Sequence, residues 1–310
     1  MEIPPALRKS IKAAPFASIL GQERVKEEVK SALLASRHLI LVGPPGVGKT
    51  TLAREVANLL PPVGEKGERV FVRAQGSPDL TAEDLIGDID PVKALQFGPL
   101  APESFTPGKI FKADKGILFF DEVNRCTEKL QNALLQALEE GKVTIGGYDV
   151  DLSADFIFIG TMNPEDSSTE KLSDVFLDRF DLIRMTYPET AVIENDIVTR
   201  ERIDVEGVAM PQRLQEYVIG FVRQLRLDKN LDRKPSVRAT IGVVDRAITT
   251  AYLRGNKHVT PEDIAAVLPS VIAHRISLKP SVKYLEEPLE YVRKQFEIFS
   301  RDHDLEGGVP

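Results

Sequence analysis

The chain has 310 residues, of which 42% are hydrophobic and 28% are charged, and its formal net charge is −7. This length and composition allow one α/β core of ordinary size and a smaller second domain, and they exclude disorder except at the two ends. The acidic balance argues against a protein whose main task is to neutralise a nucleic-acid backbone.

Cysteine and histidine usage limits the site chemistry. Cys126 is the only cysteine, so an intrachain disulfide is excluded and a reducing compartment fits. The four histidines are scattered without metal-ligand spacing, which argues against a zinc site. The N-terminus lacks a secretory signal, and nowhere do about 18 apolar residues follow one another. We therefore expect a cytoplasmic protein without a membrane span.

Short β-rich runs alternate with helical patterns through the first part of the chain. The expected strands cover residues 38–43, 69–75, 116–121, 155–160 and 181–187. This alternation predicts an αβα sandwich, in which helices cover both faces of a mostly parallel five-stranded sheet.

After Pro188 the pattern changes to amphipathic helices separated by Gly, Pro and Asn. The sequence TPED at 260–263 is a helix start, with Thr260 as the cap, proline at the first helical position and Asp263 to answer the cap. We therefore expect an α/β domain at 1–189 and an all-α domain with a C-terminal tail at 190–310.

Two segments interrupt the plain alternation. Residues 77–113 form a long insert between the second and third strands, and its prolines and glycines prevent a continuous helix. Its side chains Phe97, Leu100 and Phe105 suit contact with a partner chain and core packing equally well. Residues 142–152 carry a Gly-Gly pair between two short alternating runs, which predicts a β-hairpin.

The sequence GPPGVGKT at 43–50 matches the phosphate-binding loop pattern, and it lies between a strand and a helix as that chemistry requires. Glycines in this pattern let backbone N–H groups face the phosphates, while the lysine reaches the β and γ oxygens and the hydroxyl of Thr50 ligates Mg²⁺. The residues expected to line the nucleotide are Gly43, Pro44, Pro45, Gly46, Val47, Gly48, Lys49, Thr50 and Thr51.

The sequence ILFFDE at 117–122 supplies the second half of such a site. A buried apolar strand delivers Asp121 and Glu122 to the carboxyl edge of the sheet, where open α/β sheets bind ligands. We expect Asp121 to hold Mg²⁺ through water and Glu122 to act as the general base toward the attacking water. The alternative is a solvated acidic strand end.

The sequence GTMNP at 160–164 ends the next strand, so Asn163 is expected to emerge at the same edge. There its amide suits a hydrogen bond to the γ-phosphate or to the attacking water. The alternative is that the Asn-Pro pair only marks a turn.

Taken in order, these motifs resemble those of the AAA+ ATPases, and within them the branch of the MoxR ATPases and the I subunit of magnesium chelatase. The resemblance implies a P-loop NTPase core followed by a helical lid domain. The stretches that carry it are ILGQE (19–23), GPPGVGKT (43–50), DLIG (84–87), LFFDEVNR (118–125), LQNALLQALEEGKVTI (130–145), TMNP (161–164), LDRFDL (177–182) and AHRI (273–276).

The resemblance also implies roles for single residues. Residues 43–50 correspond to the Walker A loop, Asp121 and Glu122 to the Walker B pair, and Asn163 to sensor 1. Arg179 corresponds to the arginine finger, which this family lends to the ATP of a neighbouring subunit. Arg238 corresponds to the sensor 2 arginine of the lid, for which this branch allows action within its own subunit or on a neighbour. The segment 77–113 resembles the helix-2 insert of the branch, and 142–152 its pre-sensor-1 hairpin.

Some of these arginines also have simpler interpretations. Arg179 is flanked by Asp178 and Asp181, which fits a surface ion pair, although an arginine fork also suits a phosphate. Arg238 fits a solvated position in the first turn of a helix. Asn124 and Arg125 follow the Walker B pair and are left unassigned.

The implied function is Mg²⁺-dependent ATP hydrolysis in a homo-oligomer, expected as a hexameric ring that remodels a protein client with a metal-binding adhesion-type domain. A first alternative is the ATPase subunit of a magnesium-chelatase-like complex. A second is a nucleic-acid motor, against which the hairpin tip argues because it offers Tyr148 and two acids without a lysine or arginine. The remaining alternative is a scaffold that binds ATP without hydrolysing it.

Overall fold

The computed structural model describes residues 4–62, 68–98, 101–140, 142–145, 148–164 and 172–303. The chain divides into two compact units. The first consists of Met1–Pro44 and Gly48–Met185, and the second of Pro45–Val47 and Thr186–Pro310. Among the described residues, no helix combines the length and the apolar character needed to cross a bilayer.

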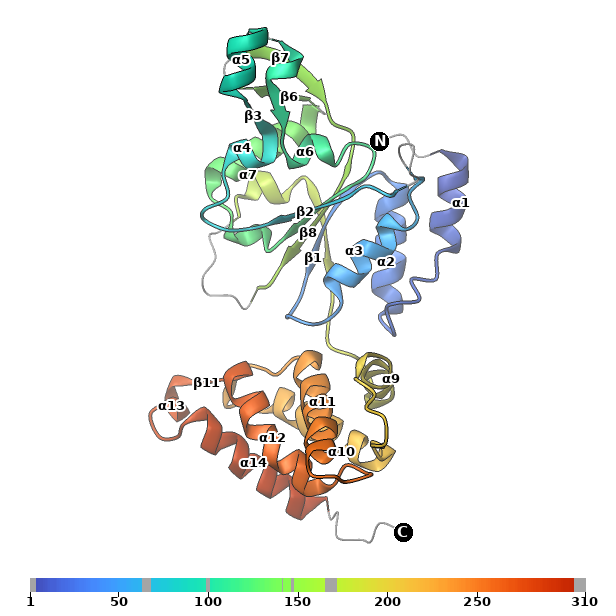
Figure 1. Ribbon diagram of the computed structural model, residues 1–310, viewed down its shortest axis with the longest axis vertical. Helices are drawn as coiled ribbons and strands as arrows, with labels where there is room; N and C mark the ends of the chain where they lie inside the picture. Colours follow the sequence, from blue (N-terminus) through green and yellow to red (C-terminus); the bar gives the residue numbers. More distant parts are fainter. Residues whose placement is uncertain are drawn as a thin grey trace. The chain divides into compact units, whose positions relative to one another are not determined.

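A five-stranded sheet forms the centre of the first unit (Figure 1). Every hydrogen-bonded pair in it is parallel, in the order β2, β5, β8, β1, β9, which confirms the predicted sheet. The strands overlap the five predicted runs, with ends that differ by at most three residues. The inner strands β1, β5 and β8 are apolar and almost fully buried, as expected of strands covered on both faces, whereas the edge strands β2 and β9 are only partly buried. Their bounds are β1 His38–Val42, β2 Phe71–Gln75, β5 Ile117–Asp121, β8 Ile157–Met162 and β9 Phe180–Arg184.

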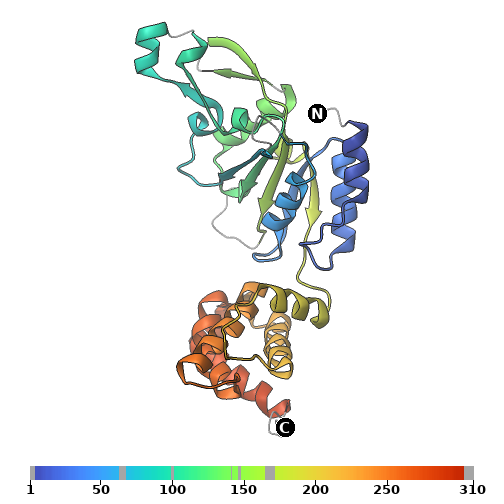
Figure 2. The same ribbon diagram turned by 45° about the vertical axis from the view of Figure 1, so that its right-hand side comes forward.

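Helices cover both faces of this sheet, with α1, α2 and α3 on one side and α7 on the other (Figures 1 and 2). Alternate side chains of one strand serve the two sides: Leu118 and Phe120 pack with Leu130 and Leu134 of α7, whereas Phe119 is buried on the opposite face. The predicted αβα sandwich is therefore confirmed. The helices of this layer are α1 Pro5–Ala13, α2 Glu23–Leu34, α3 Lys49–Ala57, α7 Glu128–Glu140 and α8 Asp174–Leu177.

The insert folds into short pieces. Its elements are α4 Ala82–Ile86, β3 Gly87–Ile89, α5 Pro91–Phe97, η1 Pro102–Ser104, β4 Phe105–Pro107 and α6 Lys109–Lys112. Strands β3 and β4 pair antiparallel, and Gly87 adopts a φ of 113° at that junction. Phe105 packs edge-on against Phe111, whereas Phe97 is 51% exposed and Leu100 lies outside the described residues.

Strands β6 (Lys142–Ile145) and β7 (Tyr148–Ser153) pair antiparallel in the segment for which a hairpin is expected. The Gly-Gly pair of its tip lies outside the described residues. Both ribbon views place this pair of strands at the same end of the first unit as α5 of the insert (Figures 1 and 2).

The second unit is built from helices around one apolar core, as predicted. Thr260 and Asp263 form the predicted capping box at the start of α12. The short ribbon of β10 and β11 was not predicted, because two or three residues are too few to show a strand pattern. The elements are α9 Ala191–Glu201, α10 Gln212–Leu227, β10 Leu231–Arg233, α11 Val237–Leu253, α12 Pro261–Ile272, η3 Ala273–Arg275, β11 Ser277–Leu278, α13 Pro280–Lys283 and α14 Pro288–Asp302.

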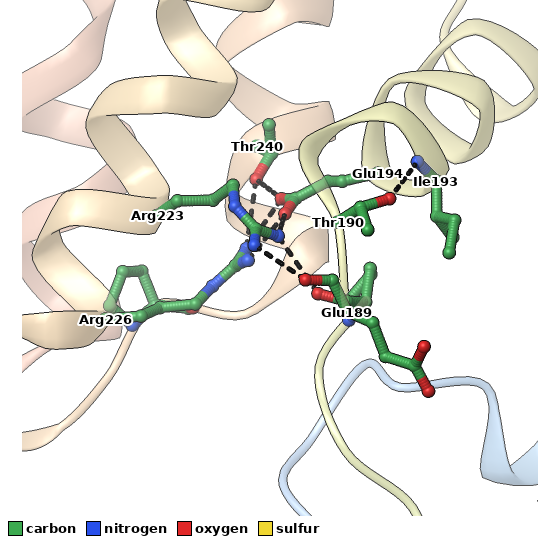
Figure 3. A network of polar contacts seen from close by, with 9 residues as sticks. Glu189, Thr190, Ile193, Glu194, Arg223, Arg226 and Thr240 are labelled. Carbon is green, nitrogen blue, oxygen red and sulfur yellow. Dashed lines mark hydrogen bonds and ion pairs between the residues drawn. The ribbon is translucent and has the colours of Figure 1, made fainter. Parts of the chain in front are cut away.

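A buried polar network joins three helices of this unit (Figure 3). Arg226 of α10 donates from both terminal nitrogens to the carboxylate of Glu194 of α9, over 2.6 and 2.7 Å. The hydroxyl of Thr240 of α11 donates to the same carboxylate over 2.8 Å, and Arg223 approaches it at 3.4 Å. Glu194 and Thr240 are fully buried, so these bonds fix how the three helices pack.

Candidate active site

The segment GPPGVGKT (43–50), predicted to be the phosphate-binding loop, leaves the carboxyl end of β1 and leads directly into α3. Gly46 and Gly48 adopt φ angles of 75° and 93°, a left-handed conformation that glycine enters without steric cost. Lys49 begins α3 and donates from Nζ to the carbonyl oxygens of Gly43 and Pro44, over 2.5 and 2.8 Å. Thr50 and Thr51 follow in the first turn, where the N–H groups of a helix have no partner within the helix and attract anions.

Gly43 fixes this loop between the ends of β8 and β9, the two strands that flank β1. Its N–H donates to the carbonyl of Met162 over 3.1 Å, and a Cβ at this position would lie 2.3 Å from the carbonyl oxygen of Met185. Asn163 follows Met162, and Met162 pairs in register with Val42. The predicted sensor residue therefore lies at the same sheet edge as the loop.

Asp121 ends strand β5, the neighbour of β8, and Glu122 follows it; Thr161 of β8 contacts both residues. The Thr161 hydroxyl donates to Asp121 Oδ1 over 2.7 Å and accepts a bond from the backbone N–H of Glu122 over 2.9 Å. Thr161 is 1% exposed, so its only hydroxyl is committed to this pair. The predicted Walker B acids are thus held by a residue that the sequence reasoning did not single out.

Glu122 has a strained backbone, with φ 55° and ψ 52°. A residue with a side chain rarely adopts this conformation, whose cost is of order 1–3 kcal/mol, and such strain collects at functional sites. The residue after β2 packs closely against this backbone. Gly76 donates its N–H to the carbonyl of Asp121 over 2.7 Å, and a Cβ on Gly76 would lie 2.0 Å from the carbonyl oxygen of Glu122.

Three further side chains hold the two acids. Arg73 Nη2 lies 2.6 Å from Asp121 Oδ2, and Gln75 Nε2 donates to Glu122 Oε2 over 3.0 Å. Arg125 Nε lies 3.3 Å from the same oxygen of Glu122, from the 3₁₀ turn η2 Val123–Arg125. Sequence reasoning assigned no role to Arg73 and Gln75, although alternation in RVFVRAQ places both on one face at the carboxyl end of their strand.

Asn124, which the sequence left unassigned, is 5% exposed and donates from Nδ2 to the carbonyl of Asn163 over 3.3 Å. This bond links the turn after β5 to the end of β8. The backbone of Asn163 is therefore fixed relative to the two acids.

Arg179 lies at the amino end of the strands, whereas all of these residues lie at the carboxyl end. It directly precedes β9, whose first residue Phe180 pairs in parallel register with His38 at the start of β1. The phosphate-binding loop follows Val42, at the other end of β1. Four residue steps of strand separate the two edges by about 13 Å, which an arginine side chain does not span. Arg179 Nη1 lies 3.4 Å from Asp178 Oδ2.

Arg238 belongs to the second unit. It lies in the first turn of α11 and its side chain is exposed, while Ser236 occupies the N-cap position without a side-chain cap bond.

The oxygen donors at the carboxyl edge of the sheet fit a magnesium ion. Thr50 supplies a hydroxyl oxygen and Asp121 a carboxylate, and oxygen donors are what this small hard cation prefers. Mg²⁺ keeps several waters in its coordination shell, so two protein side chains together with phosphate oxygens suffice.

Two stretches of the chain match known domains. Residues 38–180 match the AAA domain of the dynein-related subfamily, and residues 234–290 match an AAA lid domain.

Three curated proteins match most of the chain. YeaC of Bacillus subtilis, an uncharacterized protein, is 31% identical over an alignment of 278 residues, and the match covers 82% of this chain and 82% of its own. Chaperone MoxR1 of Mycobacterium tuberculosis is 30% identical, covering 84% of this chain and 73% of its own. The chloroplastic magnesium-chelatase subunit ChlI-1 of Arabidopsis thaliana is 27% identical, covering 92% of this chain and 79% of its own.

The same fold occurs in a solved structure of the RuvB Holliday junction branch migration motor of Thermotoga maritima. The TM-score is 0.53 at 18% identity, covering 96% of this chain and 82% of the RuvB chain.

Proposed function

Because the chain belongs to the AAA+ ATPases, in the branch of MoxR and the magnesium-chelatase I subunit, we propose that it hydrolyses ATP with Mg²⁺ as an oligomeric ring and remodels a protein partner. The observation that carries the hydrolase proposal is the placement of Asp121 and Glu122. Two adjacent acids, held from both sides at the same carboxyl edge of the sheet as the proposed phosphate-binding loop, supply what a passive nucleotide binder does not need.

In this proposal Glu122 orients the attacking water and accepts its proton. Gln75 and Arg125 contact one of its carboxylate oxygens, Oε2, which leaves Oε1 for the water. Asn163, at the end of β8, contributes its amide to the γ-phosphate or to that water. The contacts of Gln75 and Arg125 hold the carboxylate in place.

The nucleotide phosphates are proposed to lie against residues 43–51. Backbone N–H groups of Gly46 and Gly48 and the first turn of α3 face the phosphates, and the Lys49 ammonium moves from its carbonyl partners to the β and γ oxygens. Thr50 and Asp121 would hold Mg²⁺, which when bound neutralises charge on the β and γ phosphates.

Arg179 is proposed to serve the ATP of a neighbouring subunit. Its position at the amino edge of the sheet supports this, since it lies about 13 Å of strand away from its own phosphate-binding loop. A residue that acts only in a neighbour's site requires head-to-tail contacts between subunits. Such contacts close into a ring when the rotation that relates one subunit to the next permits closure. We propose a hexamer, with Arg238 of the lid as a second arginine directed at phosphate.

Mixing two inactive variants tests this arrangement. Glu122→Gln removes the base and Arg179→Ala removes the finger, and each is expected to lower ATP hydrolysis about 10³-fold or more on its own. After subunit exchange, the mixture should regain activity, because an intact Glu122 then meets an intact Arg179 across an interface. Co-assembled variants that remain inactive as a mixture would show that Arg179 does not act across the interface.

The proposed client is a protein with a metal-binding adhesion-type domain, and the exposed side chains of α5 are candidates to contact it. Val92 and Leu95 on this helix are 75% and 91% exposed, and α5 contributes no buried residue. The similarity to ChlI-1 also favours a second candidate, the ATPase subunit of a metal-insertion complex. Affinity capture from native lysate separates the two, because a large chelatase subunit would identify the second. The single cysteine fits a reducing compartment, and we propose the cytoplasm.

A nucleic-acid motor has less support. The likeness to RuvB, at 18% identity, concerns the fold alone. Single-stranded DNA that stimulated hydrolysis in a salt-dependent manner would favour this function instead.

A further inference from the structure

The edge strand β2 places a cation against one of the two acids. Arg73 Nη2 lies 2.6 Å from Asp121 Oδ2 and 3.3 Å from Gln75 Oε1, and the Arg73 carbonyl accepts a bond from Lys109 Nζ over 3.2 Å. In the parallel register Gln75 pairs with Asp121 and Arg73 with Phe119, so all four side chains lie on one face of the sheet.

Packing along β2 directs Arg73 toward the carboxyl end of the strands, where Asp121 lies. Phe71, two residues earlier on the same face, stacks on Phe119 at 5.5 Å and lies under Arg54 of α3. Ala74 is buried on the opposite face. Arg73 is therefore the last cation on this face of β2 before the strand reaches Gln75 and the insert begins.

The ion pair contributes little to folding stability. The Arg73 side chain is 52% exposed, and solvent weakens the attraction between exposed charges. Its effect on the site is different, because Asp121 is only 18% exposed and its Oδ1 already accepts the Thr161 hydroxyl. With the guanidinium on Oδ2, both carboxylate oxygens have a protein donor.

We propose that Arg73 competes with Mg²⁺ for Asp121 and so sets the Mg²⁺ concentration at which metal strengthens nucleotide binding. This inference rests on the proposed metal-binding role of Asp121. A unit positive charge in hydrogen-bond contact with a carboxylate weakens the attraction of that carboxylate for a divalent cation, and it occupies an oxygen that the hydrated ion would use.

The same charge has the opposite effect on nucleotide without metal. Arg73 neutralises Asp121, which would otherwise repel phosphate groups. Replacing the arginine by a neutral residue therefore strengthens the Mg²⁺ dependence of binding and weakens metal-free binding. A purely structural residue would change both affinities in the same direction.

The experiment measures binding of a fluorescent ATP analogue to the full chain, first with EDTA and then across a Mg²⁺ titration. For Arg73→Gln, we expect the half-saturating Mg²⁺ concentration to fall about three- to tenfold and the affinity in EDTA to fall several-fold. Arg73→Lys keeps the charge and should stay close to the wild type. Arg24→Gln makes the same charge change at an exposed arginine of α2 and should alter neither quantity.

An unchanged or raised half-saturating Mg²⁺ concentration in Arg73→Gln would overturn the inference, provided that Asp121→Asn weakens the Mg²⁺ dependence as proposed. If Asp121→Asn leaves the Mg²⁺ dependence intact, the metal-binding role of Asp121 fails and this inference fails with it. Circular dichroism of each variant shows whether the fold is retained, and Arg73→Met provides a second neutral replacement.

Discussion

Thr161 donates its hydroxyl hydrogen to Asp121 Oδ1 over 2.7 Å and accepts the backbone N–H of Glu122 over 2.9 Å. One buried hydroxyl thus fixes the position of the Asp121 side chain and of the Glu122 backbone. The strands β5 and β8 are neighbours in the sheet, so this relationship also ties their carboxyl ends together.

Removing that hydroxyl should damage the proposed catalysis more than the fold. Thr161→Val keeps the shape but leaves the Glu122 N–H without its partner, at a cost of about 1–3 kcal/mol in the free energy of unfolding. We expect ATP turnover to fall about 10- to 100-fold, because Glu122 loses its fixed direction. Urea unfolding and steady-state hydrolysis measure the two effects. Thr161→Ser, which keeps the hydroxyl, should retain most of the turnover.

A methyl group at position 76 should separate nucleotide binding from hydrolysis. In Gly76→Ala the new Cβ would lie 2.0 Å from the backbone oxygen of Glu122, and backbone cannot move aside cheaply. We expect turnover to fall about 100-fold, which is the usual effect of a misplacement of about 1 Å. Affinity for the ATP analogue should change little, because the phosphate-binding loop follows a different strand. Equal losses of binding and turnover would contradict this assignment.

Breaking the buried network of Figure 3 should destabilise the second unit. Glu194→Gln removes the charge that faces Arg226, whose side chain is 7% exposed. An uncompensated buried charge costs about 3–5 kcal/mol, to be measured as a shift of the urea midpoint at constant slope. Glu290→Gln makes the same change in an exposed pair with Arg293 and should cost about 0–1 kcal/mol. Similar shifts for the two variants would show that the network contributes nothing beyond a surface pair.

His38 should make stability fall in mild acid. Its Nδ1 accepts the N–H of Phe158 over 3.1 Å, and burial, assisted by the charge of Arg37, lowers the pKa of His38 from 6.5 to about 4. Between pH 6.5 and about 4, His38 therefore binds a proton in the unfolded chain but stays neutral in the folded chain. The free energy of unfolding should decrease between about pH 6.5 and 4, by an amount on the order of 3 kcal/mol, and this contribution should be constant above about pH 7.5.

His38→Asn is the matched control for that pH dependence, because the asparagine oxygen takes the place of Nδ1 as an acceptor and does not titrate. Above pH 7.5 the free energy of unfolding of this variant should change with pH as in the wild type. Below pH 6.5 it should lack the additional decrease. Parallel curves for both proteins throughout the acid range would show that other groups cause the loss.

The sequence predicted the strands and the phosphate-binding loop because their signals are local: an apolar run, then glycines, then a helix. Thr161, Arg73 and Gln75 were missed for a reason that is also physical. Their partners are Asp121 and Glu122, which lie about 40 residues or more away along the chain, and the contacts follow from the order of strands in the sheet. The order of strands in a sheet cannot be read from a single sequence.

The position of Arg179 could not be predicted for the same reason. The motif LDRF fixes the residue type, whereas the edge of the sheet that it occupies follows from the register of β9 against β1. The short ribbon of β10 and β11 is a smaller case, in which pairing across about 45 residues creates strands too short for a pattern.

The separation of Arg179 from its own phosphate-binding loop has a consequence for how the protein behaves in dilution. Under the proposed function, a lone chain carries a base without a finger at one edge and a finger without a base at the other, so it is folded but idle. Specific activity then rises with the amount of protein present and falls on dilution without any loss of structure. The specific ATPase activity of such a protein depends on its own concentration, so increased synthesis alone would raise that activity.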